Sequence, residues 1–141
     1  MDYRRILLAV WYNLCEEVFY MTKKIMIIDD EQSSLFLMKA ILTTAGYTVI
    51  TESKSTKALE IIQKEKPNLV LMDLVMPEIN GVELAQKIHD DAELKAVHVF
   101  AFTGMPIITE NSKKHFEKII LKPFHTTELL AEIKDFFATK K

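Results

Sequence analysis

The sequence predicts an α/β fold in which helices cover both faces of one parallel β-sheet. After Met21, short apolar runs rich in β-branched residues alternate with longer stretches whose apolar residues recur at helical spacing. The short runs are apolar throughout, which is typical of strands buried on both sides. The chain has 141 residues, enough for one domain with one sizeable core and too few for two ordinary domains.

Local signals define each element in chain order. Buried strands are predicted at 25–28, 47–51, 69–72, 97–102 and 119–121. Amphipathic helices are predicted at 32–44, 55–66, 81–89 and 126–138. Gly46 follows the first of these helices as a C-terminal cap, and Pro67 lies just beyond the end of the second. Gly81 and Gly104 fall in a loop or at a helix end, where a positive φ or a close backbone approach is expected.

Strands that alternate with helices imply right-handed βαβ units. Five such strands predict a doubly wound, flavodoxin-like sheet with the strand order 2-1-3-4-5. In this architecture ligands bind outside the carboxyl ends of the strands, where the strand order changes direction. The carboxyl ends of the predicted strands are therefore the first place to look for a functional site.

Residues 1–21 precede this pattern, so we expect an N-terminal helical extension followed by one domain at 22–141. As a helix, the extension places six apolar residues on one stripe: Tyr3, Leu7, Val10, Leu14, Val18 and Met21. A helix with this many apolar residues is not expected to be exposed to water on all sides. We expect it to pack against a second copy of the chain and form a homodimer.

Composition excludes several classes of function. The longest apolar run, residues 6–12, is too short to span a membrane, and no small-residue cleavage site follows it, so neither membrane insertion nor secretion is expected. The net charge is −2 and there is no basic run, so nucleic-acid binding is not expected either. The single cysteine, Cys15, fits a cytoplasmic protein without structural disulfides.

Four of the five predicted strands end in residues that carry chemistry. Asp29 and Asp30 follow the first strand, Asp73 follows the third, Thr103 follows the fourth and Lys122 follows the fifth. These ends meet at one edge of a parallel sheet, so we expect one shallow pocket. Clustered carboxylates repel one another unless a cation lies between them, and Mg²⁺ prefers oxygen ligands of this kind.

This combination suits phosphoryl transfer. Asp73 is the expected nucleophile, and the metal, the Lys122 ammonium and the Thr103 hydroxyl would neutralise charge on the phosphoryl oxygens. Taken singly, each of these residues is more often a turn former or a helix cap. The functional interpretation depends on their coming together at successive strand ends.

Four segments resemble the response-regulator receiver domains of two-component signalling. They are 24–31 (KIMIIDDE), 69–81 (LVLMDLVMPEING), 102–104 (FTG) and 121–124 (LKPF). The resemblance covers residues 22 to about 139, and the segment 73–81 is highly specific for the family. It implies a phosphoacceptor that is phosphorylated by a sensor histidine kinase or a phosphotransfer protein and that signals to a downstream protein target.

The resemblance also implies a role for each site residue. Asp73 would be the phosphoacceptor. Asp30, Asp73 and the backbone carbonyl of Val75 would bind Mg²⁺ directly, and Asp29 would hold it through water. Thr103 and Lys122 would bind the phosphoryl oxygens and move on phosphorylation.

Two features depart from the family pattern. The stretch between Thr103 and Lys122 contains Pro106 and has a weak apolar period, so it predicts a shortened or irregular helix where the family has a full one. Ile119 stands where many receivers carry the aromatic residue of the switch. Both features leave the mode of output open.

Three functions compete at this point. The first is a stand-alone phosphoacceptor switch, which is not an enzyme although it assists its own phosphorylation and dephosphorylation. We expect no DNA-binding or enzymatic module after Lys141, so output would be by protein contact or onward phosphotransfer. The second is a receiver-like interaction module that does not use phosphate. The third, an aspartyl phosphatase, is disfavoured because Val75 stands where such enzymes need a second acid. Val75 and Met105 are apolar and cannot orient a hydrolytic water, which predicts slow self-dephosphorylation.

Overall fold

The computed structural model describes residues 2–21, 23–104 and 109–139 and contains one five-stranded sheet with the order β2-β1-β3-β4-β5. The strands are β1 (Lys24–Ile28), β2 (Thr48–Glu52), β3 (Leu69–Asp73), β4 (His98–Thr103) and β5 (Lys118–Leu121). Every neighbouring pair is parallel. The predicted fold and strand order are confirmed, and no predicted strand end differs from the observed one by more than one residue.

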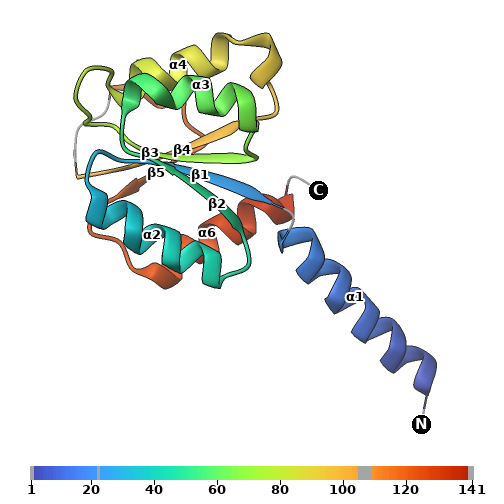
Figure 1. Ribbon diagram of the computed structural model, residues 1–141. Coiled ribbons are helices and arrows are strands. Elements are labelled where there is room, and N and C mark those ends of the chain that lie inside the picture. Colours follow the sequence, from blue (N-terminus) through green and yellow to red (C-terminus); the bar gives the residue numbers. More distant parts are fainter. Residues whose placement is uncertain (1, 22, 105–108, 140–141) are drawn as a thin grey trace.

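Helices cover both faces of the sheet (Figure 1). The helices α3 (Ser55–Glu65) and α4 (Gly81–Asp90) lie on one face, and α2 (Gln32–Thr44) and α6 (Thr126–Thr139) lie on the other. A short 3₁₀ turn, Ala92–Leu94, joins α4 to β4 and was not predicted. Each face has its own core, because the buried residues 25–28 of β1 point alternately to opposite sides of the sheet.

Two of the three glycines have the conformational role expected of them. Gly46 has φ 103, and the next residue, Tyr47, donates its N–H to the carbonyl of Leu42, which closes the end of α2. Gly81 lies against the backbone of Asp73. The expectation for Gly104 was wrong: a Cβ there would meet nothing within 4 Å, and its φ is not in the left-handed region.

The segment before β5 has the predicted irregularity. Its helix, α5 (Glu110–Lys113), has only four residues. Pro106, on which part of the prediction rested, lies outside the described residues. Ile119 is half-buried in β5 and packs against the core beside α3 and α4. The short α5 leaves this side of the sheet with less helical cover than a full helix would give.

The predicted N-terminal helix is present as α1 (Tyr3–Met21), and it projects away from the sheet (Figure 1). The large apolar side chains of its first half are exposed, with Leu7 67% and Trp11 65% accessible. The side chains of Val18 and Met21, which complete the predicted stripe, lie outside the described part. In the described part of the chain, no helix combines the length and apolarity that a membrane crossing requires.

Candidate functional site

The carboxyl ends of four strands bring the predicted site residues to one edge of the sheet. Asp29 directly follows β1, Asp73 ends β3, Thr103 ends β4 and Lys122 directly follows β5. The strand register pairs Asp73 with Phe102, so Thr103 lies one residue further along the same edge. The backbone N–H of Lys122 donates to the carbonyl oxygen of Thr103 at 2.8 Å, which ties the ends of β4 and β5 together.

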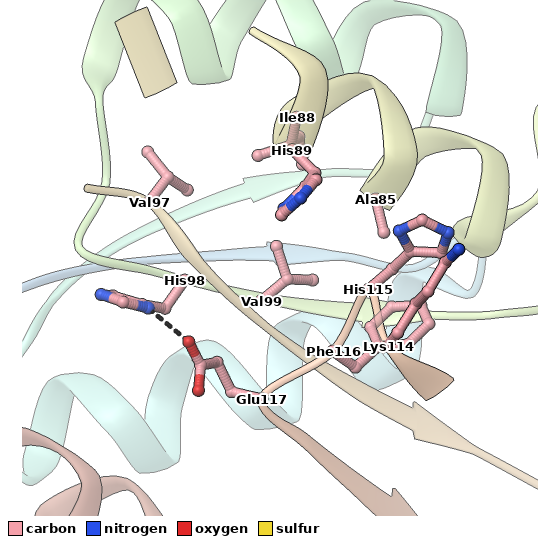
Figure 2. A pocket seen from close by; sticks show the side chains of 10 residues that line it. All are labelled: Ala85, Ile88, His89, Val97, His98, Val99, Lys114, His115, Phe116 and Glu117. Carbon is pink, nitrogen blue, oxygen red and sulfur yellow. Dashed lines mark hydrogen bonds and ion pairs between the residues drawn. The ribbon is translucent and has the colours of Figure 1, made fainter. Parts of the chain in front are cut away.

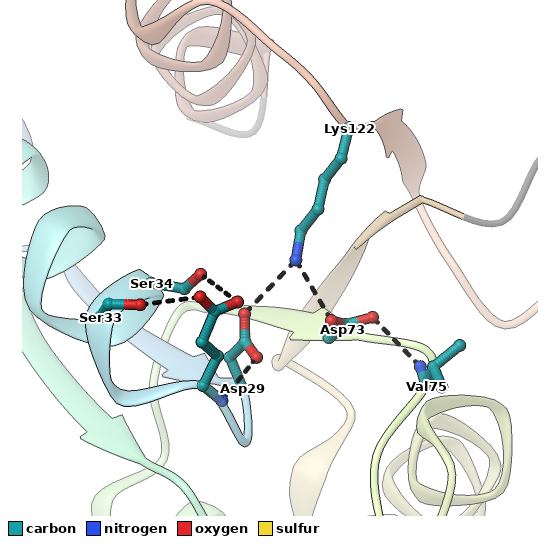
Figure 3. Close-up of polar contacts among 7 residues, drawn as sticks. Asp29, Ser33, Ser34, Asp73, Val75 and Lys122 are labelled. Carbon is teal, nitrogen blue, oxygen red and sulfur yellow. Dashed lines mark hydrogen bonds and ion pairs between the residues drawn. The ribbon is translucent and has the colours of Figure 1, made fainter.

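Lys122 points into this edge and bridges two carboxylates (Figure 3). Its Nζ lies 3.2 Å from Oδ2 of Asp73 and 3.5 Å from Oδ2 of Asp29. The same ammonium lies 4.8 Å from the centre of the Phe102 ring, a cation–π contact that holds the lysine stem in place. The burial of the Lys122 ammonium lowers its pKa, but the charges of Asp29 and Asp73 more than offset this, so the net pKa is raised and the lysine stays charged.

Asp29 is the buried member of the cluster, with only 1% of its surface accessible. Its Oδ1 accepts the backbone N–H of Glu31 at 3.0 Å. Burial raises the pKa of Asp29 above its ordinary value, although the Glu31 N–H and the Lys122 charge both lower it and the charge of Asp73 adds to the rise. Burial thus disfavours the charged form of Asp29, and a cation bound beside it would offset this cost.

Asp73 lies beside the loop that leads into α4. Its Oδ1 accepts the N–H of Val75 at 3.1 Å, which fixes the carboxylate's orientation. The N–H of Gly81 donates to the carbonyl of Leu74 at 3.0 Å and closes the loop. Asn80 then caps α4, with its side chain accepting the N–H of Glu83 at 2.9 Å.

Three carboxylates could hold a metal ion together. One oxygen from each of Asp29, Asp30 and Asp73 lies within 4.8 Å of the others, and among the described residues no other group of three or more possible ligands of this kind exists. All three ligands are carboxylate oxygens, and the carboxylate of Asp29 is buried. Such a set suits a hard cation such as Mg²⁺. Glu31 is not part of this group, and its carboxylate accepts hydrogen bonds from the hydroxyls of Ser33 and Ser34.

A second pocket lies at the opposite edge of the sheet, where β4 begins (Figure 2). It has a volume of about 200 Å³, and three of the four histidines of the chain line it: His89, His98 and His115. Nδ1 of His98 pairs with the Glu117 carboxylate at 2.7 Å. This pairing leaves the pocket without a free carboxylate nucleophile, so it does not compete as a phosphoryl-transfer site.

Sequence reasoning missed two contributors to the site. Phe102 was predicted only as a strand residue, and its contact with Lys122 depends on a side-chain direction that local patterns do not define. Ser55 was predicted only as a helix start, yet it hydrogen-bonds to the loop after Asp73. For Ser55, the one available signal was a hydroxyl at the first position of a helix.

The chain belongs to the response regulator receiver domain family, whose sequence profile matches residues 25–134. Its phosphoacceptor function in two-component signalling follows from this membership. The roles of the individual site residues and the domain boundary at residue 22 are not tested by the match and stay predictions.

Known proteins resemble the chain over most of its length. The polar-differentiation response regulator DivK of Brucella ovis is 29% identical over 119 residues, which cover 82% of this chain and 97% of DivK. The response regulator TrrA of Thermotoga maritima, solved in complex with Mg²⁺ and BeF, is 27% identical with a TM-score of 0.74 and covers 81% of this chain and 98% of its own. The receiver domain of a LuxO repressor protein from Vibrio parahaemolyticus has a TM-score of 0.76 at 19% identity, covers 84% of this chain and 92% of its own, and supports the fold alone.

Proposed function

We propose that Asp73 is the residue that accepts the phosphoryl group. The observation that carries this proposal is the Lys122 ammonium, which lies within 3.5 Å of the carboxylates of both Asp29 and Asp73 at the carboxyl edge of the sheet. A carboxylate oxygen of Asp73 would attack the phosphorus of a phosphohistidine. The new P–O bond forms as the P–N bond breaks, and the electron pair stays on the imidazole, which then takes up a proton.

The surrounding residues neutralise the charge that this transfer brings to the site. Lys122 would bind one phosphoryl oxygen, which the 3.2 Å distance between its Nζ and Oδ2 of Asp73 supports, and the Thr103 hydroxyl would bind another. We infer that Asp29, Asp30, Asp73 and the carbonyl of Val75 hold Mg²⁺, Asp29 through water. The metal, when bound, supplies positive charge between the carboxylates and the phosphoryl group. Asp73 takes up one phosphoryl group per chain, so we assign a switch and not a turnover enzyme.

The surface beside the site suits a protein phosphodonor, which we expect to meet this chain in the cytoplasm. A groove of about 520 Å³ runs between α2 and the segment after β5, with Glu31 and Lys122 among its lining residues. Leu37 also lines it and is 60% exposed, and its neighbour Phe36 is 80% exposed. Because Lys122 lines this groove and also contacts Asp73, we infer that the groove receives the helix of the histidine kinase or phosphotransfer protein that carries the phosphohistidine.

We also propose that α1 forms a homodimer with the α1 of a second copy. Asp2 lies before the helix and accepts the N–H of Arg4, but within α1 the charges oppose the helix dipole. Arg4 and Arg5 stand near the start, Glu16 and Glu17 stand towards the end, and there is no acidic residue in the first turn and no basic residue in the last. An antiparallel second copy would bring the arginines of each helix level with the glutamates of the other. The exposed apolar side chains of the first half would be covered in the same pairing.

Charge reversal tests the antiparallel pairing. Arg4→Glu with Arg5→Glu should turn a dimer into a monomer in sedimentation velocity, because both ends of the pair would then be acidic. Adding Glu16→Arg and Glu17→Arg to the same chain should restore the dimer. A wild-type monomer, with α1 bound to its own domain or to lipid vesicles, would refute the homodimer, and a dimer that ignores all four changes would refute the antiparallel arrangement.

The phosphoacceptor is tested by reaction with acetyl phosphate and Mg²⁺, followed by intact mass. The wild type should gain one phosphoryl group, and the isosteric Asp73→Asn variant should gain none. Asp90→Asn, a change at an exposed helix residue, is the matched control and should behave as the wild type. A folded wild type that gains no mass would favour a docking module that does not use phosphate.

A further inference from the structure

Among the described residues, three polar or charged side chains are buried: Asp29, Ser55 and Thr103. Asp29 and Thr103 belong to the site described above. Ser55 is only 4% exposed and is the first residue of α3, at a distance in sequence from every predicted site residue. A buried hydroxyl requires hydrogen-bond partners, and those of Ser55 lie outside its own helix.

The Ser55 hydroxyl makes two hydrogen bonds to the loop that follows Asp73. Oγ donates to the carbonyl oxygen of Pro77 at 2.7 Å and accepts the N–H of Ile79 at 3.2 Å. The residue between these two, Glu78, has φ 70, a conformation that side-chain-bearing residues rarely adopt. The N–H of Ile79 also donates to the carbonyl of Pro77 at 2.9 Å, so Glu78 forms the corner of a tight three-residue turn.

We propose that Ser55 is a positioning residue for the phosphorylation site, a role that rests on the phosphoacceptor function proposed above. Its hydroxyl joins the two sides of the strained turn at Glu78 and holds the loop between Asp73 and α4. That loop carries Val75, whose N–H orients the Asp73 carboxylate and whose carbonyl is an expected Mg²⁺ ligand. The serine therefore acts on the metal and the phosphoacceptor through the loop, without touching either.

An ordinary helix-capping role does not explain these contacts. A capping serine accepts an N–H from the first turn of its own helix. The partners of Ser55 are instead 22 and 24 residues away in sequence. The Gly81–Leu74 hydrogen bond joins the two ends of the loop and Asn80 caps α4, so Ser55 is the contact that restrains the middle of the loop.

The test compares Ser55→Ala, Ser55→Thr and a control, Thr56→Ala, which removes a hydroxyl from the exposed neighbouring position in the same helical turn. The Mg²⁺ concentration for half-maximal phosphorylation by acetyl phosphate is measured together with the maximal extent, and Mg²⁺ binding is measured separately by calorimetry. Exchange of the Ile79 amide hydrogen is followed by NMR without metal or phosphoryl donor.

For Ser55→Ala we expect about tenfold weaker Mg²⁺ binding, an equal rise in the half-maximal Mg²⁺ concentration, the same maximal phosphorylation and faster Ile79 exchange. Ser55→Thr keeps the hydroxyl and should match the wild type, as should Thr56→Ala. Unchanged Mg²⁺ binding in Ser55→Ala would overturn the proposal, even if the variant were less stable. Unchanged Ile79 exchange in Ser55→Ala would likewise overturn it, because the Ser55 hydroxyl would then not restrain the loop. A wild type that is not phosphorylated at all would instead refute the phosphoacceptor function.

Discussion

Replacement of Gly81 by alanine tests how closely the start of α4 approaches the phosphoacceptor. A Cβ at Gly81 would lie 2.6 Å from the carbonyl oxygen of Asp73 and 2.8 Å from Cα of Leu74. Both atoms belong to the backbone, so no side-chain rotation can relieve the overlap. Either the end of β3 or the first turn of α4 must move by several tenths of an ångström.

The cost of this movement can be set against the gain in helix propensity. Overpacking of a well-packed site costs roughly 1–3 kcal/mol, and backbone contacts at these distances belong at the upper end of that range. Alanine in place of glycine within a helix returns up to about 1 kcal/mol. We therefore expect Gly81→Ala to lower the free energy of unfolding by about 2 kcal/mol and the Tm by roughly 8 °C.

Urea unfolding followed by circular dichroism measures this change, and the rate of phosphorylation by acetyl phosphate reports the displacement of Asp73. Gly104→Ala is the matched control, because a Cβ there meets no atom within 4 Å although the residue directly follows Thr103. It should leave the stability within about 0.5 kcal/mol of the wild type. Equal stability losses for the two variants, or a loss only in Gly104→Ala, would refute the close-approach argument.

Three further predictions concern charge and water at the site. Burial raises the pKa of Asp29, so wild-type stability without metal should fall as pH rises from the ordinary aspartate range through the raised pKa, and Asp29→Asn should be the more stable protein at neutral pH. Urea unfolding as a function of pH measures this, and the same fall in the variant would contradict it. Lys122→Met should do the opposite, lowering metal-free stability by about 2 kcal/mol because Asp29 loses its cation, and a Tm equal to that of the wild type would count against the bridge. Val75→Asn should speed the loss of the phosphoryl group by roughly tenfold, because an amide side chain can orient a water molecule and the exposed valine cannot. Intact mass after removal of the donor measures this rate, and an unchanged rate would show that Val75 does not slow the hydrolysis.

The architecture was accessible from the sequence because it depends on periodicity. Fully apolar runs indicate buried parallel strands, and helical spacing indicates amphipathic helices. Their alternation predicts the strand order, and in a parallel sheet the carboxyl ends of the strands must lie at the same edge. Asp29, Asp73 and Lys122 come together for this reason, although Asp29 and Lys122 are 93 residues apart in the sequence. Long-range placement of this kind is a consequence of topology and needs no knowledge of side-chain packing.

The parts that sequence reasoning missed depend on side-chain direction and local backbone shape. The Ser55 contact requires α3 to begin beside the turn at Glu78. Glu78 itself has a left-handed φ, which the sequence does not indicate because the residue is not a glycine. The opposite error occurred at Gly104, where glycine suggested a special conformation that the backbone does not adopt. Residue type indicates which conformations are permitted, while neighbouring segments decide which one is used.

The absence of an aromatic residue at Ile119 changes how a switch of this kind can report its state. The two expected phosphoryl ligands, Thr103 and Lys122, are joined directly by a backbone hydrogen bond of 2.8 Å. We expect that a phosphorylation-induced shift of the Thr103 backbone would pass through this hydrogen bond to Lys122 and to the end of β5 without an intermediate side chain. β5 is one of the two edge strands of the sheet, Leu121 at its end is 54% exposed, and the preceding helix α5 has only four residues. A displacement of β5 would change a surface that a partner can contact. We therefore propose that the backbone link between β4 and β5 transmits the switch in this chain, in place of an aromatic ring.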